Sequence, residues 1–146
     1  MTLEATLPAS LAEVVDLFAS SPPRDRLELL LEYSEQIPPL PERFAAHPER
    51  LERVPECQSP LFVAAEVDDD RRVHLYMDAP PEAPTTRGFA GIFHAGLDGL
   101  PADEVLAVPD DVTIRLALAE VVSPLRLRGA SALLGRIKRQ VRDQLS

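Results

Sequence analysis

Cys57 is the only cysteine in this chain of 146 residues, and its thiol is the side-chain group with the clearest capacity for chemistry. It lies in the segment VPECQSP, residues 54–60, where polar and loop-forming residues flank it on both sides. A free cysteine is often buried as a small apolar residue. These neighbours instead favour a thiol at a loop tip or at the rim of a small cavity.

The residues next to Cys57 do not predict a self-activated nucleophile. A reactive cysteine needs a nearby positive charge or a helix N-terminus to lower its pKa, whereas the adjacent Glu56 would raise it. A thiol of this kind can still accept sulfur from an activated partner, because exchange also depends on the leaving group and on access. His47, His74 and His94 could each form a hydrolase-like pair with the thiol, but no motif supports any of them.

Several other kinds of site are missing from the sequence. There is no glycine-rich phosphate loop, no HExxH motif and no paired cysteine spacing, so we expect no bound cofactor or metal cluster. The net charge of −9 argues against a nucleic-acid partner. No apolar run approaches the roughly 18 to 20 residues that span a bilayer, and the N-terminus has no secretory pattern. We therefore expect a cytoplasmic protein without a membrane partner.

Two helices are predicted ahead of the thiol. The first begins at Ala9 or Ser10 and ends near Phe18, with Ser10 as N-cap and Glu13 completing a capping box. The second follows Pro22 and Pro23 and ends near Gln36. Its expected inward face comprises Leu27, Leu30, Leu31 and Ser34. Five prolines between residues 37 and 55 then predict a long loop that leads to Cys57.

Strand-forming residues follow the cysteine. Residues 61–67 and 73–79 flank a polar interval and predict an antiparallel hairpin. Helices are then expected around Phe89–Leu97, over 101–108, over 109–122 and from Ser123–Pro124 to the end. The fold class is α+β, a single domain over residues 1–146 with a small antiparallel sheet and helices packed on it from both ends of the chain.

The final predicted helix is basic, although the chain as a whole is acidic. Residues 123–146 contain six basic side chains and one acidic side chain. A bipolar charge distribution of this kind can steer association with a complementary protein. A solvated helix face with no further role is the alternative.

Three ordered segments resemble the SufE family of sulfur-acceptor proteins. Val54, Cys57, Gln58 and Ser59 match a V-x-x-C-Q-S signature. Glu82, Arg87 and Gly88 fit the stretch after the second strand, and the closing segment resembles the family's last helix through Pro124, Arg126, Gly129 and Ile137. The family usually has glycine directly before the cysteine, where this chain has Glu56.

The resemblance implies a fold shared with IscU-type scaffolds and a role in iron–sulfur cluster assembly. Cys57 would take persulfide sulfur from a SufS-type cysteine desulfurase, stimulate that enzyme and pass the sulfur to the SUF cluster-assembly scaffold. Pyridoxal phosphate (PLP) would belong to the desulfurase. Partner binding or loop support would fall to Gln58, Ser59, Glu82, Arg87 and Arg126. A thiol redox sensor, a cysteine hydrolase and a non-catalytic adaptor remain alternatives.

Overall fold

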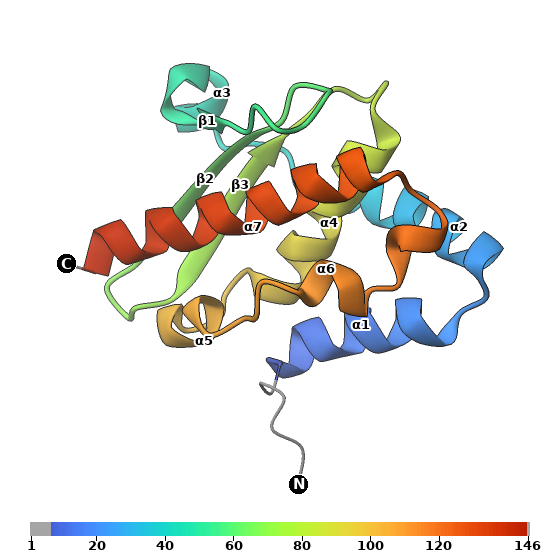
Figure 1. The fold of residues 1–146 in the computed structure, drawn as a ribbon. Coiled ribbons are helices and arrows are strands. Elements are labelled where there is room, and N and C mark those ends of the chain that lie inside the picture. The colour runs from blue at the N-terminus through green and yellow to red at the C-terminus, as the bar shows by residue number, and fades with distance from the viewer. Residues whose placement is uncertain (1–6, 146) are drawn as a thin grey trace, which may run out of the picture.

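A computed structural model describes residues 7–145 of the chain, which form a small antiparallel sheet with helices packed beside it (Figure 1). Strands β2 (Phe62–Val67) and β3 (Val73–Asp78) form the predicted hairpin, with Ala65 opposite Leu75. The short strand β1 (Glu52–Arg53) pairs with the start of β2, which gives the order β1-β2-β3. The α+β prediction is confirmed.

The long C-terminal helix α7 (Pro124–Leu145) runs beside β2, as Figure 1 shows. Because β1 pairs only with the start of β2, the remainder of that strand needs other hydrogen-bond partners. Two glutamines of α7 provide them. Gln140 Oε1 accepts from the Ala65 amide at 2.7 Å, and Gln144 Nε2 donates to the Ala65 carbonyl at 2.7 Å. The last helix is therefore hydrogen-bonded to the strand that follows Cys57 in the chain.

The N-terminal helices are α1 (Ala9–Ser20) and α2 (Pro23–Ser34). The predicted capping box is wrong: Pro8 is the N-cap, and the Ser10 hydroxyl instead donates to the Gly96 carbonyl at 2.8 Å. The predicted face of α2 is also partly wrong. Leu30 and Ser34 are buried, but Leu27 and Leu31 are exposed, and Arg26 takes the inward position by donating to the carbonyls of Phe18 and Ala117.

Helix α4 (Pro84–Leu97) packs closely against α2 because glycines lie at the crossing. A β-carbon added at Gly88 would lie 2.6 Å from Leu30 atoms, and one added at Gly91 would lie 1.9 Å from the Tyr33 carbonyl oxygen. Such distances leave no room for a side chain. The helix ends where Asp98–Gly99 predicts, and Gly99 has a positive φ of 85°.

Two segments contain more breaks or more structure than predicted. The proline-rich interval 37–55 is not a plain loop, since it contains α3 (Glu42–Ala45), the 3₁₀ turn η1 (Pro48–Arg50) and β1. The helix expected over 109–122 is instead α6 (Val112–Arg115) followed by the 3₁₀ turn η2 (Leu118–Glu120). Ala117 interrupts it with a φ of 57°, and the bond from Arg26 to its carbonyl supports that conformation.

Helix α5 (Ala102–Leu106) lies within the predicted range, and a main core connects α1, α2, α4, α5, α7 and the sheet. Cys57, Val54 and Leu61 belong to this core, so the candidate site is continuous with the folded interior. Within residues 7–145, no helix is both long and apolar enough to cross a membrane.

Candidate functional site

Cys57 occupies the turn that connects β1 to β2. Val54 and Leu61 hold the two ends of this turn, because both side chains are fully buried and the Val54 amide donates to the Leu61 carbonyl at 2.8 Å. The Cys57 amide donates in turn to the Val54 carbonyl at 3.1 Å. We call residues 55–60 the cysteine loop; buried residues hold both of its ends.

The thiol itself points inward, against α7. Only 7% of Cys57 is exposed, so the expectation of a thiol at a loop tip or cavity rim holds for the backbone but not for the side chain. The Cys57 side chain can be buried against α7 because residue 129 is a glycine. A β-carbon added there would lie 2.8 Å from Cys57 Sγ, which is closer than packed atoms approach, and only a glycine leaves space for the sulfur.

The pKa of the Cys57 thiol is raised above its ordinary value. Burial is the largest cause, the neighbouring Glu56 carboxylate adds to it, and the Arg136 guanidinium partly offsets it. The sequence-based expectation for Glu56 is therefore confirmed. In this closed arrangement the thiol is held in its neutral form at neutral pH, which slows its reaction as a nucleophile.

Ion pairs connect the cysteine loop to α7. Arg136 Nη2 donates to Glu56 Oε1 at 3.0 Å, and Arg136 Nε lies 3.1 Å from Glu52 Oε2. The second contact is an ion pair without hydrogen-bond geometry, since the buried Nε has no hydrogen-bond acceptor among the described residues. Glu52 also accepts from Arg139 and from Gln140. From the sequence, Arg136 is only one of the basic residues of the last helix; the available signal for its role is the pair Glu52 and Glu56, four residues apart beside the cysteine.

The other predicted site residues are spread over three elements. Gln58 is exposed and Ser59 half-buried on the cysteine loop, and Arg126 is exposed on the first turns of α7, three residues before Gly129. Glu82 is exposed in the turn before α4. Arg87 donates to the Ala79 carbonyl at 2.5 Å, which stabilises the connection between β3 and α4. The two elements that meet at Cys57 thus contain Gln58, Ser59 and Arg126. Arg87 instead hydrogen-bonds to Ala79, just after β3.

The basic character of α7 is partly neutralised inside the molecule. Arg136 and Arg139 pair with glutamates near the cysteine loop, and Lys138 pairs with Asp110 at 2.9 Å. Arg126, Arg128 and Arg142 are exposed. The helix is therefore less of a free basic surface than its composition indicates, and these three exposed arginines lie near its two ends.

In the described part of the chain, none of the three histidines makes a hydrogen bond to the Cys57 thiol. His47 contacts Glu49, His74 lies 2.7 Å from Asp68 Oδ2, and His94 lies 3.7 Å from Asp98 Oδ1. Among residues 7–145 there is also no group of three or more His, Cys, Asp or Glu side chains placed to hold a metal ion. The site therefore consists of one thiol packed against Gly129 and an ion pair between the cysteine loop and α7.

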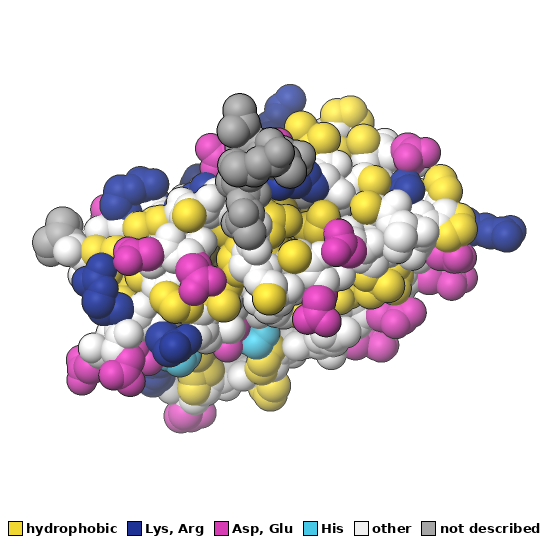
Figure 2. Space-filling model, turned by 90° about the horizontal axis from the view of Figure 1, so that it is seen from below, with side chains coloured by type: hydrophobic (Ala, Val, Ile, Leu, Met, Phe, Trp, Pro, Cys, Tyr) yellow, Lys and Arg dark blue, Asp and Glu magenta, His cyan; other side chains and the backbone are white. Residues whose placement is uncertain are grey.

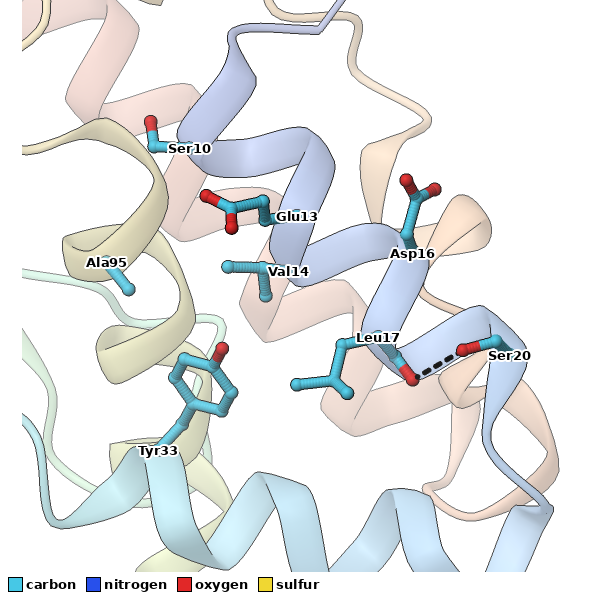
Figure 3. Close-up of a pocket in the computed structure, with 8 residues that line it drawn as sticks. All are labelled: Ser10, Glu13, Val14, Asp16, Leu17, Ser20, Tyr33 and Ala95. Atoms are coloured by element: carbon cyan, nitrogen blue, oxygen red, sulfur yellow. Dashed lines mark hydrogen bonds between the residues drawn. The ribbon is translucent and has the colours of Figure 1, made fainter.

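A separate groove of about 580 Å³ lies between α1, α2 and α4 (Figure 3). Glu13 and Asp16 lie along it with Val14, Leu17 and Tyr33, and no residue of the cysteine loop lines it. Figure 2 is turned by 90° from Figure 1 and shows the molecule from below, where apolar side chains are interspersed with acidic and basic ones. The groove is thus distinct from the Cys57 site.

Fold and site together define a small α+β protein that shelters a single thiol on a loop between two strands. The SufE family model, described as an Fe-S metabolism associated domain, matches residues 12–141. The chain is 54% identical over 143 residues to uncharacterised SufE-like proteins of two Mycobacterium tuberculosis strains, covering 98% of this chain and 99% of each relative. It is 33% identical over 129 residues to the SufE-like protein 1, chloroplastic/mitochondrial, of Arabidopsis thaliana, covering 88% of this chain and 33% of that protein.

A solved structure has the same fold. The solution structure of a hypothetical protein from Thermus thermophilus superimposes with a TM-score of 0.84 at 42% identity, covering 96% of this chain and 98% of the other. The chain therefore belongs to the SufE family. Membership gives it a sulfur-transfer role in iron–sulfur metabolism and implies interaction with a cysteine desulfurase.

Proposed function

We propose that this chain is a persulfide carrier in which Cys57 accepts sulfur from a SufS-type, PLP-dependent cysteine desulfurase. The observation that carries the proposal is the buried position of the chain's only thiol, which packs against Gly129 from the loop between β1 and β2. A carrier needs one thiol that can be reached during transfer and protected afterwards. The cysteine loop, with buried anchors at its base, can supply both states.

The transfer is a sulfur exchange without net oxidation. The Cys57 thiolate attacks the outer sulfur of the desulfurase persulfide, and a new S–S bond forms as the old one breaks. The desulfurase cysteine leaves as a thiolate and takes up the proton that Cys57 lost. The product is a persulfide on Cys57, which this chain then delivers to the SUF cluster-assembly scaffold.

Because Cys57 is buried, this exchange requires a partner that opens the cysteine loop. An attacking sulfur needs access and a thiolate, and the closed loop restricts both. Moving the side chain away from Gly129 removes burial, which is the largest cause of the raised pKa. A docked desulfurase that holds the loop open therefore makes Cys57 both reachable and more acidic. Return of the loop shields the persulfide from further oxidation.

The raised pKa also weighs against the two thiol-chemistry alternatives. A redox sensor or a cysteine hydrolase uses a thiolate that is stable at neutral pH, commonly beside a histidine. Here burial and Glu56 act in the opposite direction, and among the described residues no histidine makes a hydrogen bond to Cys57. A non-catalytic adaptor is the alternative that the following variant decides.

We expect Cys57→Ala to abolish stimulation of a SufS-type desulfurase. Alanine formation from cysteine would be measured in the absence of added thiols, with the wild-type chain and with Arg142→Gln as an exposed control on α7. Without an acceptor thiol, the persulfide stays on the desulfurase and turnover falls to the rate of the enzyme alone. Full stimulation by Cys57→Ala, with an unchanged thermal unfolding curve, would make the chain an adaptor and contradict the carrier proposal.

A further inference from the structure

Glu56 connects the cysteine loop to α7 through an ion pair. It directly precedes Cys57, and its carboxylate accepts from Arg136 Nη2 at 3.0 Å through Oε1 and at 3.3 Å through Oε2. Gly129 and Arg136 are seven residues apart on α7, about two helical turns, and so lie on the same face of that helix. One side of the loop thus meets α7 twice, once through the sulfur and once through this ion pair.

Arg136 is itself held in place from a second direction. Its Nε lies 3.1 Å from Glu52, which is anchored to α7 by Arg139 and Gln140 as well. Glu52 belongs to β1 and stays with the sheet when the loop moves. The Arg136 guanidinium therefore stays in place when the loop opens, and the contact that breaks is the ion pair with Glu56.

We propose that the Glu56–Arg136 ion pair is a latch that holds the cysteine loop closed on α7 and sets how often Cys57 is exposed. Glu56 and Arg136 are thus positioning residues for the thiol and do not react themselves. The significance of the latch for sulfur transfer rests on the proposed function, but the latch itself depends only on the contacts described. A docking protein opens the loop by offering either side chain a different counter-charge.

The test measures exposure of the thiol directly. The rate of Cys57 alkylation by iodoacetamide would be followed across pH under native conditions for the wild type, Glu56→Gln and Arg136→Gln. Division by the thiolate fraction, taken from each pH profile, gives the rate per thiolate. We expect this rate to rise about two- to fivefold in Glu56→Gln, the range for losing one partly exposed ion pair. It rises at least as much in Arg136→Gln, which also loses the contact to Glu52.

The two variants separate a latch from a purely electrostatic effect on the sulfur. Glu56 raises the pKa of Cys57 and Arg136 lowers it, so removing them moves the midpoint of the profile in opposite directions. A latch instead predicts that the rate per thiolate rises in both variants. Added salt should also raise the wild-type rate more than that of Glu56→Gln, because it screens the exposed pair.

Arg142→Gln is the matched control, since Arg142 is an exposed arginine on the same helix. Rates per thiolate in Glu56→Gln and Arg136→Gln that equal the control rate overturn the latch. If Arg136→Gln is unfolded, Glu56→Gln decides alone, because Glu56 lies on the exposed loop. Faster alkylation in both variants, together with a wild-type Cys57 that takes no sulfur from a desulfurase, leaves the latch standing and overturns the proposed function.

Discussion

Gly129→Ala is expected to displace the cysteine loop from α7 and to expose the thiol. The new β-carbon would lie 2.8 Å from Cys57 Sγ and 3.4 Å from its Cα, so the sulfur cannot stay in place. Overpacking of this kind costs about 1–3 kcal/mol. Because each 1.4 kcal/mol corresponds to about a tenfold change in an equilibrium, we expect alkylation of Cys57 to accelerate about tenfold or more.

Gly135→Ala provides a control on the same helix. Beyond the adjacent residues and the nearby backbone of α7 itself, no described atom lies within 4 Å of a β-carbon added at Gly135, an exposed position in the middle of α7. Replacing glycine by alanine at such a position stabilises a helix by about 1 kcal/mol. Both variants gain this helix propensity, so the difference between them isolates the clash with Cys57. Equal alkylation rates and equal unfolding free energies in the two variants would show that Gly129 does not seat the thiol.

Gly91→Ala is expected to cause the largest loss of stability. Its β-carbon would lie 1.9 Å from the Tyr33 carbonyl oxygen, which is a backbone atom of α2 and cannot rotate away. Helices α2 and α4 would have to separate, at a cost of about 3 kcal/mol. For a chain of this size that cost lowers the melting temperature by roughly 6–12 °C.

Thermal and denaturant unfolding would measure this effect against Gly135→Ala. The comparison is direct because both substitutions are glycine to alanine within a helix, and only one meets a neighbouring backbone. A melting temperature for Gly91→Ala equal to or above that of Gly135→Ala would mean that the two helices do not cross as closely as described. A loss of stability with an unchanged rate of Cys57 alkylation would also show that the α2–α4 crossing stabilises the fold and does not control exposure of the thiol.

Local pattern was sufficient to predict the hairpin and most helices. The strand-forming runs around the Asp68–Arg72 turn and the Asp98–Gly99 stop after α4 are signals carried by adjacent residues. The errors arose where a distant residue decided the outcome. The buried face of α2 differs from the predicted one because the Arg26 guanidinium donates to the carbonyls of Phe18 and Ala117. The Ser10 hydroxyl donates to the Gly96 carbonyl and therefore does not cap α1.

The same distinction applies to the candidate site. The sequence predicts that Cys57 lies on a loop, because its neighbours are polar and loop-forming. It does not predict that the thiol is buried, because the space for the sulfur is the missing side chain of Gly129, which lies far later in the chain. The role of Arg136 was missed for a similar reason, since its partners Glu52 and Glu56 lie 80 or more residues earlier.

Mass spectrometry of the chain after incubation with a SufS-type desulfurase, PLP and cysteine tests the central claim most directly. The carrier proposal predicts a mass increment of one sulfur atom that maps to the peptide containing Cys57 and is lost on treatment with a reducing thiol. Cys57→Ser, which keeps a side chain of similar size, should show no increment. A wild-type chain without the increment, or an equal increment in Cys57→Ser, would contradict the assignment of Cys57 as the sulfur acceptor.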